Sequence, residues 1–246
     1  MTGPADAIVE ILAGPATLAR RVADWLLAVA IAKEGSFSVA LSGGATPRLL
    51  YQTLAETPYR EAFPWSRAHW FWGDERFVPL NDSLSNYRMV QEAMLLHVPV
   101  PTANIHAMPT KGPNPEAAAL DYEQDLKTYY GSITLNPKRP LFDVVLLGLG
   151  EDGHTASLFP GTSVLAERAR WAATVIGVKP EPRITLTFPA LESTRHAAFL
   201  VSGESKRSVL ARLRAGDTAL PAAHVRPSGA LWFFIDAAAS ESATTN

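Results

Sequence analysis

The chain has 246 residues, of which 47% are hydrophobic and 19% charged, and its formal net charge is -2. This is the composition of a globular protein with a substantial core, and it lacks the excess of basic residues typical of nucleic-acid binders. The sequence contains no cysteine, which excludes disulfides, thiolate catalysis and zinc sites built on cysteine.

The first part of the chain predicts helices and strands in alternation. Apolar residues at helical spacing predict a helix over residues 16–34, which Gly35 ends. An apolar strand is expected at 37–41, and a helix follows that opens at Thr46-Pro47, because proline is favoured in the first helical turn. A second short strand is expected at 68–72, and a polar loop separates it from a helix over 85–96.

The rest of the chain continues this alternation. The proline-rich stretch 98–115 is expected to be a loop, and helices are expected over 116–130 and 204–214. Further strands are expected at four apolar runs: 142–147, 184–188, 197–201 and 231–235. The tail at 237–246 is expected to be frayed. Apolar strands that alternate with helices indicate a mostly parallel sheet covered on both faces, in a single α/β domain.

Polar and glycine-rich segments follow four of the predicted strands. They are 42–44, 73–76, 148–154 and 202–206. Ligands of open parallel sheets bind beyond the carboxyl ends of the strands. We therefore expect these four segments to meet in one composite site.

The turn after the first of these strands is a candidate phosphate-binding site. Its two glycines let the backbone approach a ligand closely, and the helix that follows points free N–H groups at it. No Gly-Lys-Ser/Thr follows, so the turn is not a Walker A loop. The candidate contacts are Ser42, Gly43, Gly44 and Thr46, and the alternative is a plain strand-to-helix turn.

The segment from Gly148 to His154 offers a general base. Its first six residues match G-x-G-x-x-G, but two carboxylates stand where a pyrophosphate would lie, which argues against dinucleotide binding. His154 can accept a proton near neutral pH, and Asp152 could hold its tautomer. A histidine that only caps a helix is the alternative interpretation.

Charged side chains in three other places complete the candidate site. Asp74, Glu75 and Arg76 follow a strand and can orient one another and a substrate. Lys206 stands in the first turn of a predicted helix, where a cation opposes the helix dipole and often serves an anionic ligand. Arg183 begins a strand and could grip a phosphate with two hydrogen bonds. Solvent-facing charge is the alternative for each, and no H-E-x-x-H or equivalent metal motif is present.

Taken in order, four segments resemble the glucosamine-6-phosphate isomerase/6-phosphogluconolactonase family over residues 41–210. They are LSGGATPRLLYQTL, FWGDERFVPLNDSLSNYRM, FDVVLLGLGEDGHTASLFPG and SGESKRSVL. The resemblance implies a modified Rossmann-like, three-layer α/β/α fold. It also implies hydrolysis of 6-phospho-D-glucono-1,5-lactone to 6-phospho-D-gluconate in the oxidative pentose phosphate pathway, with no metal or other cofactor.

The same resemblance implies roles for individual residues. His154 would be the catalytic base, with Asp74 and Arg76 in support. The phosphate contacts would fall on Gly43, Gly44 and Lys206, with Arg183 as an addition.

Two alternative functions belong to related proteins. Isomerase members carry a glutamate five residues past the histidine, where this chain has Phe159. Isomerisation with loss of an amine needs several proton transfers, whereas lactone hydrolysis needs one base that later acts as a proton donor. A regulator that only binds a sugar-phosphate effector would keep the phosphate-binding site without the base, and this chain keeps His154 and leaves no segment for a helix-turn-helix.

The surroundings of the protein can also be anticipated. The first residues lack the pattern of a signal peptide, and the longest apolar stretch, 25–32, is too short to span a bilayer. We expect a cytoplasmic enzyme, a monomer or weak homodimer, whose partner is a small sugar-phosphate lactone. We expect it to bind neither nucleic acid nor membrane.

Overall fold

The computed structural model describes residues 6–240. Within them, a seven-stranded sheet of parallel pairs runs through the centre in the order β1-β10-β9-β6-β2-β3-β5. Its strands are β1 (Ile8–Leu12), β2 (Phe37–Leu41), β3 (Ala68–Trp72), β5 (Ile105–His106), β6 (Phe142–Leu147), β9 (Thr194–Val201) and β10 (Ala230–Asp236). The predicted three-layer α/β fold with a mostly parallel sheet is confirmed.

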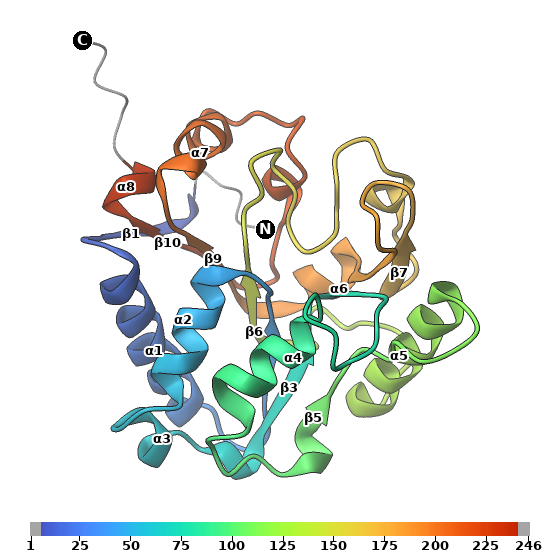
Figure 1. Ribbon diagram of the computed structural model, residues 1–246, viewed down its shortest axis with the longest axis horizontal. Coiled ribbons are helices and arrows are strands. Elements are labelled where there is room, and N and C mark those ends of the chain that lie inside the picture. Colours follow the sequence, from blue (N-terminus) through green and yellow to red (C-terminus); the bar gives the residue numbers. More distant parts are fainter. Residues whose placement is uncertain (1–5, 241–246) are drawn as a thin grey trace.

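Helices lie on both sides of this sheet (Figure 1). The α-helices are α1 (Pro15–Ala32), α2 (Ala45–Leu54), α3 (Tyr59–Ala62), α4 (Asn86–Val90), α5 (Pro115–Tyr130), α6 (Phe188–Glu192), α7 (Arg207–Arg214) and α8 (Ala237–Ser240). A π-helical turn, η3 (Gln91–Leu95), extends α4. The 3-10 turns are η2 (Trp65–Arg67), η4 (Thr102–Asn104), η5 (Ser163–Ala166), η6 (Glu204–Lys206) and η7 (Pro221–His224). Helices α1, α2 and α4 share one layer, while α5 and α6 lie on the other side of the sheet (Figure 1).

The sequence explains why the central strands are buried on both faces. All residues of β2 and β6 are buried, and β3 contributes Trp70, Phe71 and Trp72 to the core. Burial of each such side chain stabilises the fold by about 1.5–3 kcal/mol relative to leaving it exposed. Among the described residues, no helix is both long and apolar enough to cross a membrane.

A second, smaller sheet was not predicted. It is antiparallel, in the order β4-β8-β7, with β4 (Asp74–Arg76), β8 (Arg183–Leu186) and β7 (Ala172–Val175). Strand β4 follows β3 after a single glycine, Gly73, so the small sheet extends the end of the large one. This placement brings Arg183 to the same sheet end as Asp74 and Arg76.

Two strands of the large sheet were not predicted, and two predicted boundaries are wrong. Strand β1 was missed because it is short and lies at a sheet edge, where Ile8, Val9 and Ile11 are exposed. The expected loop 98–115 contains β5. The expected strand 184–188 ends at Leu186, because Pro189 favours the first turn of α6.

The expected frayed tail contains α8. The carboxylate of Asp236 accepts a hydrogen bond from the Ala239 N–H at 2.9 Å and so stabilises the first turn of this helix. The rest of that prediction, 241–246, lies outside the described residues.

Candidate active site

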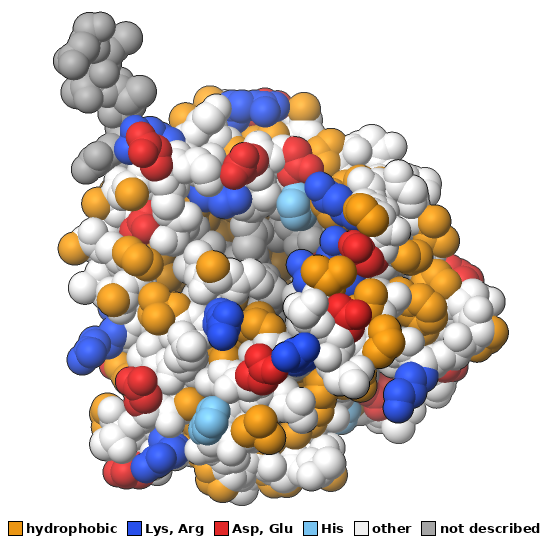
Figure 2. All heavy atoms as spheres, viewed as in Figure 1, with side chains coloured by type: hydrophobic (Ala, Val, Ile, Leu, Met, Phe, Trp, Pro, Cys, Tyr) orange, Lys and Arg blue, Asp and Glu red, His pale blue; other side chains and the backbone are white. Residues whose placement is uncertain are grey.

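A cavity of about 490 Å³ opens at the carboxyl ends of the central strands. In Figure 2 it is a hollow whose rim carries a histidine and several lysine and arginine side chains. Nine of the ten predicted site residues line it: Ser42, Gly43, Gly44, Thr46, Asp74, Arg76, His154, Arg183 and Lys206. The tenth, Asp152, contacts His154 from behind. The four polar segments therefore do meet in one site.

The turn that follows β2 contains Gly43 and Gly44 and is called the twin-glycine turn below. It is shaped by the residues behind it. A Cβ atom at Gly43 would stand 2.1 Å from the amide oxygen of Asn86, so no larger residue fits there while Asn86 keeps its place. Gly44 has φ 108°, a left-handed conformation that favours glycine, and it leads directly into α2. The hydroxyl of Tyr51 donates to the Ser42 carbonyl at 2.8 Å and accepts from the Ser42 N–H at 3.0 Å. The first turn of α2 consequently points at the cavity from a fixed position.

His154 is held by Asp152. Its Nδ1 lies 2.5 Å from one oxygen of Asp152, and the same oxygen accepts the His154 backbone N–H at 3.1 Å. Partial burial would raise the pKa of Asp152, but the hydrogen bonds and charge of His154 outweigh it and hold that pKa below its usual value. On its other side the imidazole packs against Phe159, with 4.5 Å between ring centroids. The ring is therefore oriented by two neighbours and remains 29% exposed.

Gly150 leaves room for this arrangement. A Cβ atom at Gly150 would lie 2.0 Å from Nδ1 of His154. The Gly150 N–H also donates to the His154 carbonyl at 2.8 Å, which closes the loop on itself. The glycine pattern in this segment thus serves the histidine.

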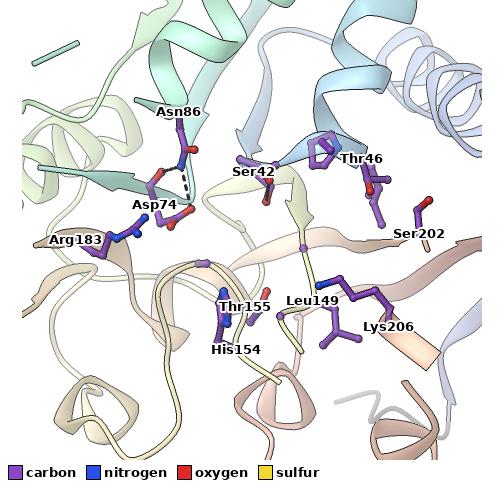
Figure 3. Close-up of a pocket in the computed structure, with 18 of the residues that line it drawn as sticks. Ser42, Thr46, Asp74, Asn86, Leu149, His154, Thr155, Arg183, Ser202 and Lys206 are labelled. Carbon is purple, nitrogen blue, oxygen red and sulfur yellow. Dashed lines mark hydrogen bonds between the residues drawn. The ribbon is translucent and has the colours of Figure 1, made fainter. Parts of the chain in front are cut away.

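Asp74 connects the histidine loop to the twin-glycine turn. It is buried, and one of its oxygens accepts from the Ser157 hydroxyl at 2.7 Å. The side-chain amide of Asn86 donates to the Asp74 carbonyl at 2.9 Å and to the other carboxylate oxygen at 3.4 Å. Figure 3 shows Asp74 and Asn86 together on one wall of the cavity.

Glu75, expected with Asp74 and Arg76 to orient a substrate, instead supports this wall from behind. It is buried and accepts backbone N–H groups from Arg76, Asn86 and Tyr87, each at 2.7 Å. Burial raises the pKa of Glu75, while these hydrogen bonds oppose the rise. Its carboxylate therefore fixes the polar loop over β4 rather than facing the substrate side.

The cationic side chains approach the cavity from opposite sides. Arg76 and Arg183 are directly opposed across β4 and β8, and burial, then the charge of Arg76, lower the pKa of Arg183. Lys206 reaches in from η6, with Glu151 4.0 Å away. In Figure 3, Arg183 and Lys206 lie on either side of His154. Such a distribution suits an elongated anion.

The cavity also contains residues that the sequence reading did not assign. They are Asn86, Thr155, Lys179 and Ser202, together with small and apolar neighbours. Lys179 lies in the loop before β8 with its ammonium 5.6 Å from the centre of the Phe159 ring. Lys179 stands four residues before Arg183 in the sequence, and this proximity could have suggested it as a site residue. Among the described residues, no group of three or more His, Cys, Asp or Glu is arranged to hold a metal ion.

Comparison with known proteins identifies the family. The family described as "Glucosamine-6-phosphate isomerases/6-phosphogluconolactonase" matches residues 13–233. The chain belongs to this family. The family resemblance predicted from four segments is therefore confirmed.

Individual members are similar over nearly their whole length. A 6-phosphogluconolactonase from Nostoc sp. is 42% identical over 94% of this chain and 96% of its own. One from Synechocystis sp. is 43% identical over 86% of this chain and 87% of its own. Among solved structures, the devB protein has a TM-score of 0.86 at 29% identity, covering 95% of this chain and 98% of its own. A 6-phosphogluconolactonase from Thermotoga maritima has a TM-score of 0.79 at 30% identity, covering 94% of this chain and 99% of its own.

Proposed function

We propose that this protein hydrolyses 6-phospho-D-glucono-1,5-lactone to 6-phospho-D-gluconate, the second reaction of the oxidative pentose phosphate pathway. The names of its relatives bear out the expectation that the chain is an enzyme of the lactonase type. The observation that carries the specific reaction is the His154–Asp152 pair, which faces a cavity with cationic side chains on both sides.

In the proposed complex, the phosphate of the substrate binds at the twin-glycine turn. There the first turn of α2 offers backbone N–H groups and the positive end of its dipole, and Lys206 supplies a full charge. A phosphate anchored in this way presents the lactone ring to His154. Arg183, predicted as a further phosphate contact, lies across the cavity from Lys206 in Figure 3.

The hydrolysis itself uses the free nitrogen of His154. An ionised carboxylate only accepts hydrogen bonds, so the neutral imidazole carries its proton on Nδ1, toward Asp152, and Nε2 is the basic atom. Nε2 takes a proton from water as the water oxygen bonds to C1. The tetrahedral intermediate then expels the ring oxygen, which receives the proton back from the imidazolium. This sequence needs one base and one acid, both supplied by His154, and no metal ion.

Phe159 favours hydrolysis over isomerisation. It is buried, and its ring packs against His154. The family resemblance implies a glutamate at this sequence position in isomerase members. An apolar ring cannot move a proton between C1 and C2. It can only orient the base, which is sufficient for attack by water.

The test is a direct comparison of two substrates. Purified protein is given 6-phosphoglucono-δ-lactone, with acid release followed in a pH-stat above the uncatalysed rate, and glucosamine 6-phosphate, with ammonia release measured. We expect turnover of the lactone alone, and loss of on the order of 100- to 10,000-fold in kcat for His154→Gln. Release of ammonia without lactone hydrolysis would contradict the proposal.

A further inference from the structure

Beside His154 the cavity contains a hydroxyl that has no partner within the described residues. Thr155 is 1% exposed, yet its Oγ1 makes no hydrogen bond and the residue lines the cavity. In Figure 3 its side chain stands next to the imidazole of His154. Leaving a buried hydroxyl unpaired is costly, so one that stands at a cavity is a candidate to bind a ligand there.

Other unpaired atoms at the cavity are of a different kind. Of the buried polar side-chain atoms without a partner, three belong to residues that line it: Arg76 Nε, Thr155 Oγ1 and Arg183 Nε. Both arginines carry a charge; Arg183 lies on a wall distant from Lys206 in Figure 3, and Arg76 is paired with Arg183 across β4 and β8. Of these three donors, only the hydroxyl of Thr155 is uncharged. Thr155 also directly follows the proposed base, His154, in the sequence.

Part of the backbone around His154 is occupied by contacts within the protein. Five N–H groups of this segment already donate hydrogen bonds, at distances of 2.8–3.1 Å: those of Gly150, Gly153, His154, Ser157 and Leu158. A hydrolase of this kind needs donors for the negative charge that develops on the carbonyl oxygen. These five donors are therefore engaged within the loop, whereas the buried hydroxyl of Thr155 beside the base is not.

The turn that carries Thr155 has an uncommon backbone conformation. Ala156, the next residue, has φ 49° and is the one non-glycine residue with positive φ among the residues described. Such a conformation costs on the order of 1 kcal/mol and tends to persist where the surrounding structure needs it. Here Ser157, hydrogen-bonded to Asp74, and the Leu158 N–H, bonded to the Thr155 carbonyl, hold the turn in place.

We propose that Thr155 is a further catalytic residue, whose hydroxyl donates a hydrogen bond to the C1 oxygen of the lactone as that oxygen becomes negatively charged. This inference rests on the proposed function. As the water oxygen bonds to C1, the carbonyl pair moves onto the C1 oxygen and the water proton goes to His154. When the bond from C1 to the ring oxygen breaks, that pair re-forms the carbonyl, while the hydroxyl proton stays on Thr155 throughout.

The experiment compares Thr155→Val, which replaces the hydroxyl by a methyl group, with Thr155→Ser, which keeps it. Loss of one such donor lowers kcat by on the order of 100-fold, and we expect this for Thr155→Val with KM changed less than about threefold. Thr155→Ser should stay within about threefold of the wild type. The melting temperature of free Thr155→Val should equal or exceed that of the wild type, because the substitution removes an unpaired buried hydroxyl.

Thr110→Val is the matched control. Thr110 also carries a buried hydroxyl without a partner but does not line the cavity, so its variant should keep the wild-type kcat. Full activity of Thr155→Val, or a clear fall in its melting temperature, would overturn the inference, because the hydroxyl would then be dispensable or structural. Wild-type protein that does not hydrolyse the lactone would instead refute the proposed function, and this inference with it.

Discussion

Replacing Asp152 by asparagine removes the negative charge next to the proposed base, His154, while changing little else. Asp152 Oδ1 accepts from both the ring and the backbone N–H of His154. Asparagine retains an oxygen at that position, so the loop can keep its backbone contact. What is lost is the negative charge 2.5 Å from Nδ1, which stabilises the imidazolium formed during the attack of water.

The size of the effect follows from the exposure of the pair. A hydrogen bond to a charged group contributes about 1.5–3 kcal/mol, and solvent weakens this where the partners are accessible. The side chains of His154 and Asp152 are 29% and 47% exposed, so we take the lower end of that range, about 1.5 kcal/mol. Since about 1.4 kcal/mol corresponds to a factor of ten, kcat of Asp152→Asn should fall by about 10-fold.

The assay is the pH-stat measurement of kcat and KM, together with the melting temperature. Glu151→Gln is the matched control, because it removes a neighbouring carboxylate that lies toward Lys206, and its kcat should be unchanged. If Asp152→Asn kept full kcat, the carboxylate would have no part in the reaction. If both variants lost kcat equally, the net charge of the loop would be responsible and the specific pair would not.

Three further outcomes are expected. Lys206→Ala should raise KM for the phosphorylated lactone by at least about 10-fold and leave KM for glucono-δ-lactone nearly unchanged, and equal effects on both would remove Lys206 from the phosphate site. Gly43→Ala should lower kcat/KM by on the order of 100-fold in the same assay, because its Cβ would displace Asn86, and an active variant would show that the turn tolerates a side chain. Burial, then the charge of His106, lower the pKa of His69, so below about pH 6.5 the unfolded chain binds more protons and stability decreases as pH falls. The melting temperature should therefore fall between pH 7 and 5, with a smaller fall for His69→Phe, and identical pH profiles would contradict this assignment.

The sequence predicted the parts of the fold whose residues are mostly apolar. Strands β2, β3 and β6 are largely apolar runs, interrupted only by Ser38, His69 and Asp143, and their identification placed the polar segments at one sheet edge. Strand β7 could not be found in this way, because only Ala172 and Val175 of its four residues are buried. A short strand that is buried only at its two ends resembles a loop unless its pairing partner is known.

The candidate site, like the fold, was predictable only where a local sequence pattern marks its residues. His154 and Lys206 could be recognised because each lies in a glycine-containing segment that follows a predicted strand. The position of Arg183 against Arg76 depends on the antiparallel pairing of β8 with β4, which no local pattern indicates. Burial of Thr155 was equally invisible, since threonine occurs on surfaces and in cores alike.

The acidic residues of the site show why spacing alone does not assign roles. Asp74 and Glu75 are adjacent in sequence and both buried, but successive residues of a strand point to opposite faces. Asp74 therefore lines the cavity and joins Ser157 to Asn86, whereas Glu75 accepts three backbone N–H groups behind the wall. Removing either carboxylate would leave several buried donors unpaired, so the variants Asp74→Ala and Glu75→Ala should both lose activity. The melting temperature should fall further for Glu75→Ala, because it loses more hydrogen bonds; the opposite order would mean that Asp74 contributes more to the stability of the fold than Glu75 does.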